Sequence, residues 1–389
     1  GDEGTQLVAG LELVEAPLGN PFATGWYSVP TMSFLAYGFM MEFLGATIAG
    51  GRMLSVVLGT LTVASTFLLG RVMGGRRIGW WSASILAISS YHIHFSRLAS
   101  NQIGDPWVGT LALLFLWVGY DSEKHPRVSC AAWGIAGVIA GLGWYGYFGA
   151  RWVTILVAIF LLWRVWADPA FLFRYRRAFG LLILGGLITL LPLLGWYQSH
   201  PSALTERYNA VSIFASGWLA REQEVTGRSA IYLMGQQLWR SFTAFHLTPD
   251  PTFWYRPGHP LVDFVTGGFL LVGIAGALSR ARLPSHGLIL IWFFSTVLMA
   301  WGLTENPPSS QRGVLLMPPV AVLVAWGIRD VLKVLPLALS NHRWVIGALL
   351  AVIMILNVGF YFAVYTPSRV YGNPTAEIAT AVGRFQRTD

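Results

Sequence analysis

The chain has 389 residues, of which 54% are hydrophobic and only 11% are charged, and its mean hydropathy is +0.56. A soluble domain carries about 25% charged residues, so this sequence has too few charges to cover the surface of a water-soluble particle. The net charge of +8 comes almost entirely from arginine. In a membrane protein such charges mark cytoplasmic loops rather than a nucleic-acid surface. The composition therefore predicts an integral membrane protein with no nucleic-acid partner.

About ten apolar segments approach the roughly 20 residues that a bilayer crossing needs. They lie near residues 54–73, 79–95, 105–120, 130–148, 152–168, 178–197, 262–279, 286–303, 314–332 and 344–365. A further apolar stretch, residues 28–48, carries Glu42 and several small residues, and we expect it to lie in the interface. The sequence therefore predicts an all-α polytopic protein with about ten membrane-spanning helices and outer juxtamembrane helices.

Positive charge recurs at alternate connections between these segments. The basic connections contain Arg71, Arg76 and Arg77; Lys124 and Arg127; Arg174, Arg176 and Arg177; Arg280 and Arg282; and Arg329, Lys333 and Arg343. The positive-inside rule assigns them to the cytoplasm. The segments that then face outward are residues 1–52, 96–104, 198–261, 304–313 and 366–389. Because no helix precedes the first outward segment, we expect that one more helix precedes Gly1 in a longer protein.

The longest outward segment, residues 198–261, has helical patterning around Ser229–Phe245 and then becomes Pro-rich and aromatic. Long loops in compact proteins are often functional or act as lids. The chain shows no convincing internal repeat, which weakens the interpretation as an inverted-repeat transporter.

The outward segments also hold charges that the positive-inside rule does not explain. Arg52, Arg97 and Arg312 lie there, and so do the adjacent acids Asp2 and Glu3. An anionic ligand such as a lipid phosphate would compensate for the arginines, although snorkelling to headgroups or pairing with local acids is the alternative. Transfer of a sugar from a phosphate to a hydroxyl needs a base for the hydroxyl proton and positive charge for the departing phosphate. The carboxylates and arginines together supply both.

Further polar and aromatic residues are candidates for the substrate pocket. They are His94, Asn101, Asp105, Tyr27, Tyr145 and Trp254. His92 and His94 are two residues apart and point in different directions on a helix, so we do not expect them to bind a metal together. No cofactor is predicted. Asp2 and Glu3 could bind a divalent cation, but no His or Asp spacing requires one.

Four stretches of the chain, in this order and with these spacings, form a family pattern over nearly all of residues 1–380. They are Asp2-Glu3-Gly4; residues 51–63, GRMLSVVLGTLTV; His94-Phe95-Ser96-Arg97 followed by Asp105; and the Pro-rich residues 249–263 together with Gln311-Arg312-Gly313. On these residues the chain resembles glycosyltransferase family 39, the protein O-mannosyltransferases and the bacterial aminoarabinose-transferase-like enzymes of the GT-C superfamily.

The resemblance implies an inverting glycosyltransferase that moves a sugar from a polyprenyl-phosphate donor to an acceptor hydroxyl of a protein, lipid or glycan. It implies a GT-C-type catalytic domain over residues 1–365, with residues 1–53 as the first outer loop and juxtamembrane helix. Residues 198–261 would form the long outer loop, and residues 366–389 would begin an extracytoplasmic region. We expect a multi-pass protein of a bacterial cytoplasmic membrane, with its active site facing the periplasm or exterior.

Carried over residue by residue, the resemblance makes Asp2 the catalytic base, Glu3 its support and Arg52 a residue that binds or structures the donor-phosphate region. The His-Pro-Pro or Lys-Pro-Pro segment usual after the acidic pair is replaced by residues 19–22, GNPF. A phosphate-binding lysine of some members has no counterpart. These departures leave the donor sugar and the acceptor open. The alternative is a lipid-linked-sugar flippase or transporter without chemistry, which the position of the ionisable residues at the segment ends disfavours.

Overall fold

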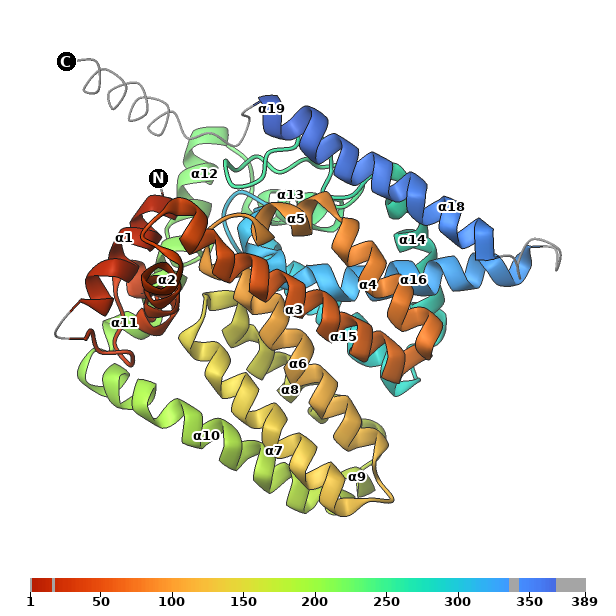
Figure 1. Ribbon diagram of the computed structural model, residues 1–389. Helices are drawn as coiled ribbons and strands as arrows, with labels where there is room; N and C mark the ends of the chain where they lie inside the picture. Colours follow the sequence, from red (N-terminus) through yellow and green to blue (C-terminus); the bar gives the residue numbers. More distant parts are fainter. Residues whose placement is uncertain (1, 16–17, 336–342, 369–389) are drawn as a thin grey trace.

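The computed structural model describes residues 2–15, 18–335 and 343–368, apart from the side chains of residues 2, 26 and 343 (Figure 1). Within this part the chain is helical or irregular and forms no β-strand beyond two isolated bridges. The helices of at least ten residues are α1 (Asp2–Val14), α2 (Thr31–Leu44), α3 (Ile48–Gly74), α4 (Arg76–Ile88), α6 (Gly104–Asp121), α7 (Pro126–Leu142), α8 (Phe148–Ala167), α10 (Arg176–Ser199), α11 (Ser202–Val211), α13 (Ala230–Phe242), α14 (Phe264–Ser279), α15 (Pro284–Val297), α16 (Met317–Val334), α18 (Arg343–Met354) and the π-helix η7 (Ile355–Tyr365).

Shorter helical elements join these. They are α5 (Ser90–Ser96), α9 (Ala170–Arg174), α12 (Trp218–Thr226), α19 (Thr366–Ser368), the 3₁₀ turns η1 (Trp26–Ser28), η2 (Asn101–Ile103), η3 (Gly143–Tyr145), η5 (Ser310–Arg312) and η6 (Val314–Leu316), and the π-helix η4 (Leu298–Gly302).

Eight helical stretches of the described residues are long and apolar enough to cross a membrane. They are Ile48–Gly74, Asn101–Asp121, Pro126–Tyr145, Phe148–Ala167, Arg176–Ser199, Pro284–Gly302, Val314–Val334 and Trp344–Ser368. Each overlaps one of the ten segments predicted from hydropathy. The predicted class, an all-α polytopic membrane protein, is confirmed.

The other two predicted crossings differ in the structure. The segment at 262–279 forms α14, which has only 16 residues. The segment at 79–95 is not one helix but two, α4 and α5. Ser89 leaves the helical conformation (φ −64°, ψ 121°), and its hydroxyl accepts the N–H of His92 to begin α5. A serine hydroxyl competes for backbone hydrogen bonds in this way, and hydropathy alone does not detect it.

Two predicted helices outside the crossings are present. The stretch at 28–48 contains α2, and the patterning around Ser229–Phe245 corresponds to α13, whose N-cap is the Ser229 hydroxyl. Of the predicted C-terminal region, residues 369–389 lie outside the described part of the chain.

Glycines bring neighbouring helices into backbone contact. In Figure 1, α7 and α10 lie side by side along one flank, and a Cβ on Gly137 of α7 would lie 2.0 Å from the carbonyl oxygen of Leu182 in α10. In the same way, a Cβ on Gly273 of α14 would lie 1.9 Å from the carbonyl oxygen of Leu323 in α16. Since lipid tails are as apolar as leucine, helices in membranes gain most from such close packing.

The pair α1–α2 is placed against the end of α3 by polar contacts. A Cβ on Gly38 of α2 would lie 2.1 Å from the carbonyl oxygen of Gly10, so α1 and α2 touch through their backbones. The buried Tyr37 hydroxyl donates to the carbonyl oxygen of Ser100 at 2.7 Å and lies 2.7 Å from Oγ of Ser55 in α3. These contacts bring the N-terminal helix next to the turn that begins α6.

Gly273→Val should destabilise the protein, because the added side chain cannot fit between α14 and α16. We expect a loss of about 1–3 kcal/mol or more, the usual cost of overpacking, measured by thermal unfolding in detergent. Gly268→Val is the matched control on the same helix, since a Cβ there meets nothing within 4 Å. Equal melting temperatures of the two variants would contradict this account of the helix contact.

Candidate functional site

A cavity of about 360 Å³ lies where α1, α11, η2, η5 and the Pro-rich loop meet. Its lining residues are Glu3, Gln6, Tyr27, Val29, Phe34, Ala99, Ser100, Asn101, Gln102, Tyr147, Arg207, Phe253, Trp254, Gln311 and Arg312. With the exception of Tyr147, all of them come from segments that charge alternation predicts on one side of the membrane. The fold therefore gathers these distant segments around one cavity.

The carboxylate of Glu3 is held on one wall by Arg52 and by a backbone amide. Nε and Nη2 of Arg52 donate to the two carboxylate oxygens at 2.7 and 2.8 Å, and the N–H of Ala99 donates to Oε1 at 2.8 Å. The two side chains are 22% and 41% exposed. A bidentate arginine–carboxylate pair is both strong and directional, so this contact fixes α1 against α3 and the turn after α5.

Two arginines, Arg207 and Arg312, line another part of the cavity together with Tyr147. Arg207 of α11 donates to the hydroxyl of Tyr147 at 3.0 Å, and Nη1 of Arg312 donates to the carbonyl oxygen of Glu305 at 2.7 Å. Nε of Arg312 is buried and has no hydrogen-bond partner. Arginine offers five N–H donors in a planar arrangement that suits phosphate oxygens. This group can therefore accept an anion that enters the cavity.

Burial lowers the pKa of the Arg312 guanidinium from its usual value; the nearby Tyr147 opposes this effect, and Arg207 adds to it. Both guanidinium groups line the same cavity, so their positive charges act on each other. An anion bound between them would relieve that repulsion.

Amides and aromatic rings complete the wall of the cavity. Asn101, Tyr27 and Trp254, all predicted as pocket residues, line it. Nε2 of Gln6 and Oε1 of Gln102 are buried without a hydrogen-bond partner, and such groups carry a free-energy cost unless something bonds to them. Amides and aromatic faces together can bind a hydroxyl-rich ring.

The backbone beside the cavity is strained at Tyr27 and Ser28, which have positive φ angles of 50° and 56°. Non-glycine residues in this region cost of order 1 kcal/mol or more each, and such strain concentrates at functional sites. The neighbouring hydroxyl of Ser28 donates to the Glu206 carboxylate, which ties η1 to α11 next to Arg207.

Besides Arg52, which holds Glu3 from behind, four predicted site residues with described side chains are not among those that line the cavity. The guanidinium of Arg97 lies over the rings of Tyr361 and Phe362, at 5.5 and 4.9 Å from their centroids. It therefore packs on the last membrane-spanning helix. His94 is buried, and its Nε2 lies 2.6 Å from the carbonyl oxygen of Trp254. It supports the loop that brings Trp254 to the cavity.

Asp105 and Tyr145 are buried further inside the helix bundle. A Cβ on Gly149 would lie 2.2 Å from Oδ2 of Asp105, so this carboxylate lies against the first turn of α8. The hydroxyl of Tyr145 donates to the carbonyl oxygen of Thr189 in α10 at 2.8 Å. The side chain of Asp2, the predicted base, lies outside the described part of the structure.

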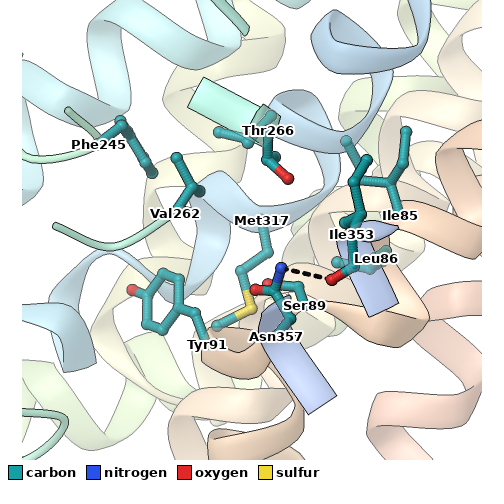
Figure 2. A pocket seen from close by; sticks show the side chains of 12 residues that line it. Ile85, Leu86, Ser89, Tyr91, Phe245, Val262, Thr266, Met317, Ile353 and Asn357 are labelled. Atoms are coloured by element: carbon teal, nitrogen blue, oxygen red, sulfur yellow. Dashed lines mark hydrogen bonds between the residues drawn. The ribbon is translucent and has the colours of Figure 1, made fainter. Parts of the chain in front are cut away.

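A smaller pocket of about 20 Å³ lies between α4, α16 and the last spanning helix (Figure 2). Apolar side chains form most of its wall, together with Ser89, Thr266 and Asn357. Asn357 accepts from both polar hydrogens of Ser90 and donates to Asp263 at 2.7 Å and to the carbonyl oxygen of Ile353 at 3.0 Å. This network attaches the last helix to the N-cap of α14, and the pocket is separate from the charged cavity.

Among the described residues, no group of three His, Cys, Asp or Glu side chains is arranged to hold a metal ion. Glu3, which the sequence offers as a possible cation ligand, has both oxygens engaged by Arg52 and Ala99.

Sequence reasoning missed several cavity residues, above all Arg207 and Tyr147. Arg207 lies in the long outward segment 198–261 together with Arg221, Arg228, Arg240 and Arg256, and the local sequence does not distinguish it from them. Tyr147 lies at the end of a predicted crossing and has no signal of its own. Its place at the cavity depends on how η3 and α8 pack.

The fold resembles that of two solved membrane glycosyltransferases. ArnT from Cupriavidus metallidurans, solved bound to undecaprenyl phosphate, superposes with a TM-score of 0.60 and 11% identity over 95% of this chain and 69% of ArnT. The oligosaccharyltransferase AglB from Archaeoglobus fulgidus was solved with an inhibitory peptide and a dolichol-phosphate. It has a TM-score of 0.55 and 15% identity over 93% of this chain and 51% of AglB. A structure of an Archaeoglobus fulgidus oligosaccharyltransferase with Zn and sulfate has a TM-score of 0.59 and 15% identity over 92% of this chain and 48% of that protein.

The protein therefore has the GT-C fold of polytopic membrane glycosyltransferases, and the predicted resemblance to this superfamily is confirmed at the level of the fold. No protein-family model matches the chain, and no curated protein matches its sequence. Membership of family 39 remains a prediction from the motifs.

Replacing Glu3 and Arg52 by alanine should reveal an energetic coupling between the two residues. Each single variant should lower the free energy of unfolding, and Glu3→Ala/Arg52→Ala should lose less than the sum, with a coupling of about 1 kcal/mol for this partly exposed pair. The measurement is thermal unfolding of the three variants in detergent. The more exposed pair Arg174 and Glu123, at 3.3 Å, is the control and should show little coupling. A coupling no larger than that of the control would refute the role given to the Glu3–Arg52 contact.

Proposed function

We propose that the protein is an inverting glycosyltransferase that moves a sugar from a polyprenyl-phosphate-linked donor to an acceptor hydroxyl. The observation that carries this proposal is the cavity bounded by the Glu3–Arg52 pair and by the two arginines Arg207 and Arg312. The GT-C fold supports it, since two solved proteins with this fold bind undecaprenyl phosphate and dolichol-phosphate.

In the proposed reaction the acceptor oxygen attacks the anomeric carbon of the sugar. The bond from that carbon to the phosphate oxygen breaks, so the configuration at the carbon inverts. The hydroxyl proton passes to the carboxylate of Asp2, which precedes Glu3 at the start of α1. Glu3 is better suited to positioning, because its oxygens already accept three hydrogen bonds.

The leaving phosphate is proposed to bind between Arg207 and Arg312. Charge developing on the phosphate would then meet two guanidinium groups in a partly buried site, where electrostatic stabilisation is strongest. This assignment keeps Arg312 from the sequence prediction and adds Arg207. It gives Arg52 and Arg97 positioning roles, because Arg52 pairs with Glu3 and Arg97 lies over the rings of the last helix. The hydroxyl could belong to a protein, a lipid or a glycan.

Asp2→Asn should abolish transfer while leaving the fold intact, because an amide cannot take the hydroxyl proton. General-base catalysis contributes about 10²–10⁴-fold to a rate, so we expect at least a 100-fold loss. The assay follows a labelled sugar from a polyprenyl-phosphate donor in purified protein. Glu12→Gln, at an exposed position of the same helix, should keep full activity. Full turnover by Asp2→Asn would remove this residue from the mechanism.

Arg207→Gln and Arg312→Gln should weaken binding of the donor phosphate. The loss of a charge-assisted hydrogen bond, about 1.5–3 kcal/mol, corresponds to about a 10- to 100-fold higher dissociation constant for a short-chain polyprenyl monophosphate. Binding is measured by calorimetry in detergent. Arg256→Gln, at an exposed position in the same outer segment, serves as the control. Unchanged affinity in both variants would place the phosphate elsewhere.

The same assay separates the enzyme from a flippase or transporter. An enzyme transfers or hydrolyses the lipid-linked sugar in detergent, where no gradient exists. A protein that binds the donor and moves it across vesicles without any sugar transfer would instead support the transport alternative.

A further inference from the structure

On the helix α13, in the long segment between α10 and α14, two of the three buried residues are polar, whereas several large apolar side chains are exposed. Gln237 and Ser241 are 2% and 0% exposed, whereas Ile231 and Trp239 are 85% and 64% exposed. Phe242, one turn further along the same side, is 46% exposed. In water the apolar face would turn inward, because exposed apolar surface costs free energy in proportion to its area.

The buried side of α13 carries Leu233, Gln237 and Ser241, and Gln237 has a partner in a distant segment. Nε2 of Gln237 donates to the carbonyl oxygen of Thr304 at 3.2 Å, and the hydroxyl of Ser241 donates to the carbonyl oxygen of Gln237 at 2.7 Å. The Gln237 hydrogen bond attaches this side of α13 to the turn after η4, while the Ser241 hydroxyl is satisfied within the helix. The large apolar side chains on the opposite side face outward.

α13 lies beside the end of a stretch that is long and apolar enough to span the membrane. α13 packs on η4, the last turn of the spanning stretch Pro284–Gly302. Leu298 and Met299 of η4 are themselves 37% and 36% exposed. The apolar face of α13 thus extends the lipid-facing surface of a membrane-spanning helix at the end where the cavity lies.

An arginine and a tyrosine at the start of α13 fit the boundary between headgroups and acyl chains. Arg228 donates to the hydroxyl of Tyr232 at 2.9 Å, and its guanidinium lies 4.6 Å from the centre of that ring. Tyrosine and tryptophan are enriched at membrane interfaces, and arginine extends its charge toward lipid phosphates while its stem covers apolar surface.

We propose that α13 lies in the membrane interface, with Ile231, Trp239 and Phe242 inserted among the lipid chains on the side of the membrane that holds the cavity. The occupant of this face is the bilayer itself, since the face is continuous with a spanning helix and carries the interfacial residue types.

This placement has a consequence for the cavity. Thr304, which accepts from Gln237, precedes Glu305, whose carbonyl oxygen holds the guanidinium of Arg312. Through these two hydrogen bonds, α13 is connected to the cavity residue Arg312. A position of α13 in the interface would therefore keep Arg312 near the level of the lipid headgroups. The inference concerns the position of the protein in the bilayer and does not depend on the proposed reaction.

The test is fluorescence quenching of a probe at position 231 in lipid nanodiscs. Ile231→Cys is made in a Cys130→Ala background, labelled with a small thiol-reactive fluorophore, and exposed either to phosphatidylcholine with a nitroxide on the acyl chain or to aqueous iodide. Ile188→Cys, on the exposed face of the spanning helix α10, and Glu224→Cys, exposed on α12, are the lipid and water controls.

We expect the label at position 231 to be quenched by the lipid nitroxide as strongly as the label at 188, and to be protected from iodide. Quenching by iodide to the extent seen at 224 would overturn the proposal, because the face would then be in water. Protection from both quenchers would overturn it as well, since another protein surface would then cover the helix. None of these readings requires sugar transfer, so a failure of the proposed enzyme activity leaves this test intact.

Discussion

The contact between Glu3, Arg52 and the amide of Ala99 joins three parts of the chain that are far apart in sequence. It joins the start of α1, the first turn of α3 and the turn that leads to α6. Buried or half-buried charges must be paired to be tolerated. Here the guanidinium of Arg52 and the N–H of Ala99 both donate to the carboxylate of Glu3. The cavity wall, the position of α1 and the proposed placement of the residue before Glu3 all depend on this contact.

The arginines near this end of the protein divide into two kinds according to what satisfies them. Arg52 is neutralised by Glu3, and Arg97 packs against aromatic rings of the last helix. Arg207 and Arg312 instead meet only neutral oxygens among the contacts described, those of Tyr147 and Glu305. Glu305 and Asp250 are near enough to Arg312 to raise its pKa, but neither forms an ion pair with it among the described residues. This incomplete neutralisation at a cavity is the physical reason for placing an anionic ligand there.

Hydropathy predicts most of the helical architecture. It predicts the helical membrane class and, among the described residues, the eight stretches that are long and apolar enough to cross a membrane, because a spanning helix must satisfy its own backbone and cover about 20 residues with apolar side chains. It fails at residues 79–95, where a single serine hydroxyl ends one helix and starts another. A capping contact of this kind does not change hydropathy.

By itself, the sequence determined which segments gather at one end of the bundle and which charged residues stand there, since these follow from composition along the chain. Only the tertiary structure decided how those charges pair. It placed Glu3 on Arg52, moved Arg97 onto Tyr361 and Phe362, and brought Arg207 and Tyr147 beside Arg312. Such pairings join residues from 49 (Glu3 and Arg52) to 265 (Arg97 and Phe362) positions apart, and local sequence patterns carry no information about them.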